Sequence, residues 1–225
     1  TYWNNNLTSQ NLFGIANLQS RYRTGFSLDD TYVLVSDELD WGFKILKQDW
    51  QYHLSKNHMI LAGFEIKSLF SNYNYESKYQ FVDPFRSQLD QLGDGFKHSS
   101  LNIKGRSYAV YLSNRFKVNK ALTIEPGLRW DKQTYSDEQQ FSPRINFDYS
   151  NGSNNRYKFS WGVYQQTQGI HQLPVEDGIE FFRPVQKVKK VNITYQSTIL
   201  DDYGLMVSIY HKNYINPLPR FENIL

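Results

Sequence analysis

The sequence predicts an all-β protein: a segment of an antiparallel transmembrane β-barrel with long outer loops and short periplasmic turns. Apolar and polar residues alternate over stretches of ten or more positions, which is longer than an ordinary strand and long enough to cross a bilayer. The connections between these stretches alternate in length, as the two ends of such a barrel require. Aromatic residues make up 16% of the chain, a fraction typical of barrels with aromatic girdles at both membrane interfaces.

The clearest pattern lies in two hairpins, Ser107–Tyr135 and Phe141–Gln166, joined by the short loop Ser136–Gln140. One face of their strands is apolar and the other is polar. This alternation, with a period of two residues, is typical of a β-strand with one buried or lipid-facing side. The apolar row, which we expect to face lipid, contains Leu122, Ile124, Leu128 and Trp130. The polar row, which we expect to face the lumen, contains Thr123, Glu125, Arg129, Asp131 and, in the next strand, Arg144. A supporting network of ion pairs explains these lumen residues better than contact with a ligand.

The rest of the chain extends the strand pattern to about nine strands. Residues 15–23 form a candidate strand. In residues 39–54 the apolar positions shift from odd to even numbers after Ile45, and such a slip predicts a β-bulge. Short turns are expected near residues 55–58, 117–121, 150–155 and 200–203, and longer connections near 27–37, 76–106 and 167–184.

Several classes of function are disfavoured by composition. The chain has no cysteine, which excludes disulfides and thiolate metal sites, and its net charge of +3 is too small to indicate nucleic acid. The five histidines show no metal-binding spacing, and residues 90–95 only approach the calcium-loop pattern. No Ser/His pair shares a strand face. We therefore expect neither an enzyme nor a resident metal or cofactor.

Residues 127–131 (GLRWD) and 141–145 (FSPRI) resemble the paired "GLRYD … FSPRL" strands of TonB-dependent outer-membrane transporters. Further stretches at residues 57–63, 160–166 and 210–218 resemble other strands of that family in the same order. The resemblance covers residues 38–218 and implies energy-coupled uptake of a scarce nutrient across the outer membrane of a Gram-negative bacterium. The implied cargo is an iron chelate, corrinoid, glycan or peptide, and the implied partner is periplasmic TonB.

Transporters of this family carry an N-terminal plug, which binds TonB, and a barrel of about 22 strands. We therefore interpret residues 1–225 as a partial barrel domain without the plug. Two other interpretations remain open: a passive, porin-like barrel of the outer membrane, and a secreted all-β domain that binds carbohydrate or mediates adhesion.

Cargo contacts are expected from outer loops, with ordinary loop residues as the alternative. The candidates are Phe85, Arg86, Phe96, His98, His171, Phe181, Phe182 and Arg183. Parity places Lys187 and Lys189 above an outward apolar row, at the depth of lipid headgroups, so we expect them to contact lipopolysaccharide phosphates; a solvated charge run is the alternative. An outward aromatic girdle is expected from Trp41, Trp50, Tyr52, Trp130, Phe141, Tyr149 and Tyr157.

Overall fold

The described residues form one antiparallel sheet of ten strands, in which each strand pairs with its neighbours in sequence. The computed structural model describes residues 2–4, 6–28, 30–81, 95–152, 154–200 and 203–217. The strands are β1 (Tyr2–Asn4), β2 (Leu7–Leu28), β3 (Thr31–Ser55), β4 (His58–Gln80), β5 (Gly95–Lys117), β6 (Leu122–Gln133), β7 (Glu138–Ser150), β8 (Asn155–Gln166), β9 (Gln186–Leu200) and β10 (Tyr203–Ile215). The all-β barrel prediction is confirmed, with β2–β10 as the expected long strands.

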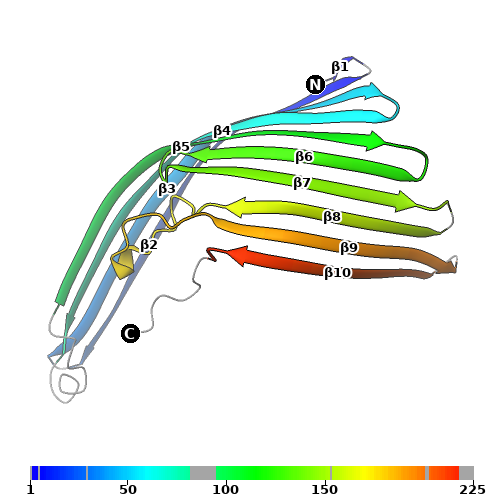
Figure 1. Ribbon diagram of the computed structural model, residues 1–225. Helices are drawn as coiled ribbons and strands as arrows, with labels where there is room; N and C mark the ends of the chain where they lie inside the picture. The colour runs from blue at the N-terminus through cyan, green and yellow to red at the C-terminus, as the bar shows by residue number, and fades with distance from the viewer. Residues whose placement is uncertain are drawn as a thin grey trace.

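The strands fall into two length classes. Strands β2–β5 contain 22 to 25 residues, whereas β6–β10 contain 12 to 15. Figure 1 shows the four longer strands continuing past the others and bending away. This part of the sheet, residues 17–28, 31–44, 68–80 and 95–106, is called the extension below.

One of the expected long connections is wrong and another was predicted too wide, because the extension occupies these residues. Strand β2 ends at Leu28 and β3 begins at Thr31, so no long connection spans residues 27–37. Likewise β4 continues to Gln80 and β5 begins at Gly95, so most of residues 76–106 is strand. The ends of these strands carry many polar side chains, as loops do. Their composition therefore led to the prediction of loops in place of strands.

The register defines two faces of the sheet. On β6, Leu128 pairs with Leu112 of β5 and Pro143 of β7, and all three share one face, called the outer face. Leu128 and Leu112 are exposed there, as expected of side chains that meet lipid. The opposite, inner face carries Arg129, and Asp131 is buried on it.

The β-bulge expected in β3 is absent. Pairing of β3 with β4 runs without a break from Tyr32 to His53, and the register shifts only between His53 and Ser55. The apolar row that ends at Ile45 lies on the inner face, while Leu46 begins a row on the outer face. Trp41 is therefore not part of the outward girdle, contrary to the prediction; the other six girdle residues lie on the outer face.

A small hydrophobic core explains why the apolar face of β3 changes. The connection between β8 and β9, residues 167–185, folds back onto the inner face of the extension and contains the 3-10 helix η1 (Val175–Asp177) (Figure 1). Its Leu173 and Val175 are buried against Tyr73 of β4. The surrounding side chains are Leu39, Tyr75, Leu101, Ile103 and Phe182. Within the described residues, no helix is long and apolar enough to span a membrane.

Candidate functional site

The β8–β9 connection is held in place by the hydroxyl of Tyr73. This hydroxyl donates to the carbonyl oxygen of Ile170 at 2.9 Å and accepts from the backbone N–H of Leu173 at 3.0 Å. Tyr73, Ile170 and Leu173 are all at most 4% exposed. Burial raises the pKa of Tyr73 above its ordinary value of 10.0, so the hydroxyl stays protonated and can make both bonds at physiological pH.

Two aromatic contacts add to this anchor. The ring of His171 stacks on the indole of Trp41, with centroids 3.9 Å apart and planes 13° from parallel. Burial lowers the pKa of His171 below its ordinary value of 6.5, which favours the neutral ring. Phe182 meets the ring of Tyr135 edge-on at 4.9 Å, and the Tyr135 hydroxyl donates to the carbonyl of Gln168 at 3.1 Å.

Polar contacts complete the attachment. Lys97 donates from Nζ to the carbonyl of Glu176, and Ser99 donates from Oγ to the Glu180 carboxylate at 3.1 Å. Because both β5 side chains belong to the extension, they hold the far end of the connection. The connection thus brings imidazole, aromatic and guanidinium groups to the inner side of the sheet.

The expected cargo residues separate into three groups. His171, Phe182 and Arg183 all lie on the connection, as does Phe181, which is 69% exposed. Phe96 and His98 lie on β5 rather than in a loop, and the register puts them on the outer face, with ring centroids 6.3 Å apart. Phe85 and Arg86 lie outside the described residues. No cluster of three or more His, Cys, Asp or Glu side chains suited to a metal occurs in the described part of the chain.

Below the connection, the inner face of the wall carries charges in pairs. Arg129 holds both carboxylate oxygens of Asp131, at 2.7 to 3.0 Å, and Arg115 holds Glu125 at 2.8 Å. The other inner pairs are Lys47–Asp49, Lys67–Glu65 and Arg156–Asp148. This is the arrangement expected of a supporting network, because the side chains neutralise one another across and along the strands.

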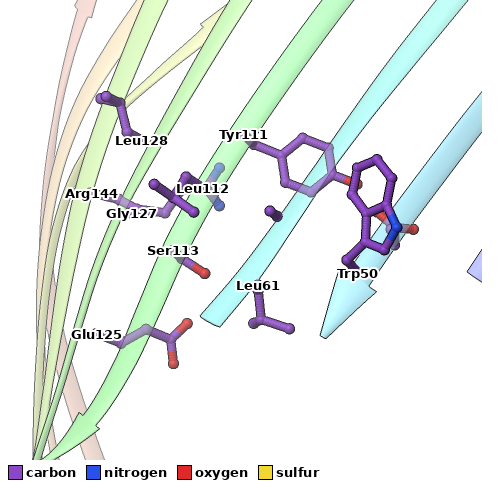
Figure 2. A pocket seen from close by; sticks show the side chains of 11 residues that line it. Trp50, Leu61, Tyr111, Leu112, Ser113, Glu125, Gly127, Leu128 and Arg144 are labelled. Carbon is purple, nitrogen blue, oxygen red and sulfur yellow. The ribbon is translucent and has the colours of Figure 1, made fainter. Parts of the chain in front are cut away.

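Tyr111 lies at the centre of this network. Figure 2 shows its ring extending from β5 across the neighbouring strand. A Cβ added at Gly63 would lie 2.4 Å from the Tyr111 hydroxyl, so only glycine leaves room for the ring. The Lys47 ammonium and the Arg129 guanidinium lie over the ring, 5.9 and 5.5 Å from its centroid. Tyr111 therefore packs the wall and receives two cations at once.

Arg144 is different from these paired cations. It forms no ion pair among the described residues and lines a hollow of about 310 Å³ with Glu125 and Tyr111 (Figure 2). Gly127 leaves room for its stem, since a Cβ there would lie 3.1 Å from Arg144 Cγ.

Three residues of the site were not identified from sequence: Trp41, Tyr73 and Tyr135. The alternation of Tyr73 and Tyr75 with polar residues was a strand signal, but nothing in it indicated what the tyrosines would contact. Trp41 gave a clear signal of alternation, but the prediction placed it on the wrong face.

Comparisons with known proteins agree with this geometry. The chain is similar in structure to FpvA of P. aeruginosa in complex with iron and a heterologous pyoverdine, with a TM-score of 0.66, 14% identity, and coverage of 95% of this chain and 31% of that chain. It is also similar to the copper transporter OprC, with a TM-score of 0.56, 10% identity, and coverage of 89% and 38%. The chain thus spans about a third of the length of these proteins. A search of curated proteins found no match. The family profile described as "TonB dependent receptor-like, beta-barrel" matches residues 1–216, so the chain belongs to this family.

Proposed function

We propose that this chain is part of the barrel wall of an outer-membrane receptor that imports a scarce nutrient by TonB-dependent, energy-coupled transport. A plug outside this chain would bind periplasmic TonB. The observation that carries the proposal is the β8–β9 connection fixed over the inner face, because a connection held there supports selective binding of a cargo rather than passage through an open channel. Members of the family to which the chain belongs are receptors and not enzymes.

The cargo contacts that we propose are His171, Phe181, Phe182 and Arg183. Phe181 is exposed beside them, and an aromatic ring next to a guanidinium can hold a planar or anionic solute. Phe96 and His98 face away from the inner face, so the proposal does not include them. The cargo class is an iron chelate, corrinoid, glycan or peptide.

Uptake by cells that express the full-length receptor tests this function. Cells would receive each labelled cargo class in turn, with and without functional TonB. We expect saturable uptake of one class that disappears without TonB. Uptake that persists without TonB would indicate a passive barrel, and recovery of the protein in the soluble fraction would indicate a binding module.

Removal of the exposed Phe181 ring tests the proposed cargo contacts. Phe181→Ala should raise the concentration of cargo needed for half-maximal uptake by about tenfold, since stacking on one ring is worth about 1–2 kcal/mol. Phe96→Ala is the matched control because this ring, 62% exposed, lies on the outer face. Equal effects of the two changes would contradict the assignment.

The outer wall also supports contact with lipopolysaccharide through Lys187 and Lys189. The register aligns Lys189 with Val163 of β8 and Asn213 of β10, on the same outer face as Ile193. An ammonium just above an apolar row gains attraction to phosphate without being buried in hydrocarbon. A photocrosslinker at position 189 in intact cells should capture lipopolysaccharide. Capture of cargo or of a periplasmic protein would show that this end of β9 points elsewhere.

A further inference from the structure

A second group of cations occupies the outer face of the extension where the lipid-facing rows end. On β3 the apolar outer row stops at Leu46 and Lys44 follows; on β5 it stops at Tyr108 and Arg106 follows. Lys44 and Arg106 pair with the same residue, Ser68 of β4. They therefore stand in one row across three strands, about 10 Å apart at the backbone.

A third cation stands one step further up. Lys104 precedes Arg106 by two residues on the same face, a rise of about 7 Å. These three side chains line one hollow of about 440 Å³ together with Asn17, Phe70 and Thr134. The ring of Phe70 leans over β3, where a Cβ added to Gly42 would lie 2.7 Å from it. The hollow thus has cations around it and an aromatic ring in its lining.

The charges of this hollow are not compensated. Seven lysines and arginines elsewhere in the described sheet pair with a carboxylate, whereas Lys44, Lys104 and Arg106 form no ion pair there. The next carboxylate along the same face of β3 is Asp40, four residues from Lys44 and about 13 Å away. Arg106 has a side-chain hydrogen bond to Tyr108, but this partner is a neutral hydroxyl, so the positive charge of the cluster is left to attract an anion.

The backbone beneath the cluster is fixed. The N–H of Arg106 donates to Thr134 Oγ1 at 2.8 Å, and the N–H of Thr134 donates to the Arg106 carbonyl at 2.9 Å. Arg106 is therefore held at the end of β6, and its direction is set by the sheet rather than by a loop. A fixed pair of cationic rows favours a bound anionic group over a diffuse ion atmosphere.

We propose that Lys44, Lys104 and Arg106 form a binding site for the phosphate groups of a phosphorylated glycolipid of the outer leaflet. The lipid is chosen over a soluble anion because the apolar row of Phe13, Leu46, Ile66 and Tyr108 lies directly below the cations, where acyl chains would pack. The site rests on the proposed outer-membrane location, but it is independent of cargo uptake. In the order of the sheet it lies four to six strands from Lys187 and Lys189, which are on β9.

Lipid binding to the purified full-length receptor tests the site. The receptor would be titrated with a bisphosphorylated glycolipid, its dephosphorylated form and inorganic phosphate, and bound lipid would be counted by native mass spectrometry. The test variant carries Lys44→Gln, Lys104→Gln and Arg106→Gln. The matched control carries Lys56→Gln, Lys117→Gln and Lys120→Gln, which remove three exposed cations at the other end of the strands. Circular dichroism would establish that both variants are folded.

We expect the test variant to bind the phosphorylated lipid about a hundredfold more weakly, or roughly fivefold for each cation removed, and the control to bind normally. A variant with Lys44→Arg and Lys104→Arg should keep normal binding, since it keeps the charge. Equal losses in the test and control variants, or equally tight binding of dephosphorylated lipid or inorganic phosphate, would overturn the proposal. Failure of cargo uptake with normal lipid binding would count against the proposed transport function alone.

Discussion

His171 stacks on Trp41, with the ring centroids 3.9 Å apart, and this contact joins the β8–β9 connection to a strand more than a hundred residues earlier in the chain. The imidazole is partly withdrawn from water, and burial lowers its pKa. Attachment of the connection is therefore linked to the protonation of one side chain.

The first prediction concerns pH. The attached state favours neutral His171, whose pKa lies below its ordinary value of 6.5, so attachment is strongest above pH 6.5. It weakens as the pH falls through the lowered pKa, because the released ring binds a proton more readily. Hydrogen exchange of amides 169–178, corrected for the intrinsic pH dependence, should report this loss. His171→Phe keeps a stacked ring and should remove the pH dependence; attachment that strengthens in acid would contradict the prediction.

The second prediction concerns the Tyr73 hydroxyl. Tyr73→Phe removes the partner of the buried Leu173 N–H and of the Ile170 carbonyl, so local opening of the connection should become easier by about 1–3 kcal/mol. Tyr75→Phe is the matched control, since Tyr75 packs against the same core without a hydroxyl contact among the described residues. Hydrogen exchange at residue 173 measures the opening. Similar exchange in the two variants would mean that packing alone holds the connection.

Strand β3 shows what the sequence could and could not reveal. The alternation in residues 122–131 was sufficient to predict strand, parity and face because lipid lies on one side along the whole of β6. Strand β3 meets lipid on its outer face at Leu46 and a protein core on its inner face at Leu39. A bulge in a strand that meets lipid along one face would shift the apolar positions in the same way. A straight strand that meets lipid along one part and a protein core along the other gives the same pattern, and β3 is of this second kind.

The site was only partly predictable for a related reason. His171 and Phe182 were identified by residue type in a loop, but Trp41, Tyr73 and Tyr135 meet them only because β8 and β9 return the connection to the extension. That meeting depends on contacts between residues about a hundred positions apart, which periodicity cannot report.

The third prediction tests the two faces. Leu128→Arg places a cation on the outer, lipid-facing row and should cost about 2–4 kcal/mol of folding free energy. Arg144→Leu, on the inner face and without an ion pair among the described residues, should change it by about 0.5 kcal/mol or less. Arg129→Leu is a poor control because it leaves the Asp131 carboxylate, whose side chain is 13% exposed, without its ion-pair partner. Refolding titrations of the full-length receptor in lipid vesicles give these values, and equal costs for Leu128→Arg and Arg144→Leu would contradict the assignment of faces.

The fourth prediction concerns the close approach of Gly63 and Tyr111. Gly63→Ala forces a methyl group to within 2.4 Å of the phenol ring, so the ring or the strand must move, at a cost of about 1–3 kcal/mol. Gly204→Ala is the matched control, because the nearest atom to its added Cβ is 4.0 Å away.

A double-mutant cycle separates the clash from the intrinsic effect of alanine in a strand. Tyr111→Ala removes the ring and should cost stability by itself, since Lys47 and Arg129 lose the aromatic face beneath them. In that background Gly63→Ala should cost less, because the ring is gone and the remaining close atom is the Gln48 carbonyl oxygen, 2.7 Å from the added Cβ. Refolding titrations of the single and double variants measure the coupling. If Gly63→Ala were equally costly with and without the ring, strand geometry rather than the Tyr111 contact would explain the glycine.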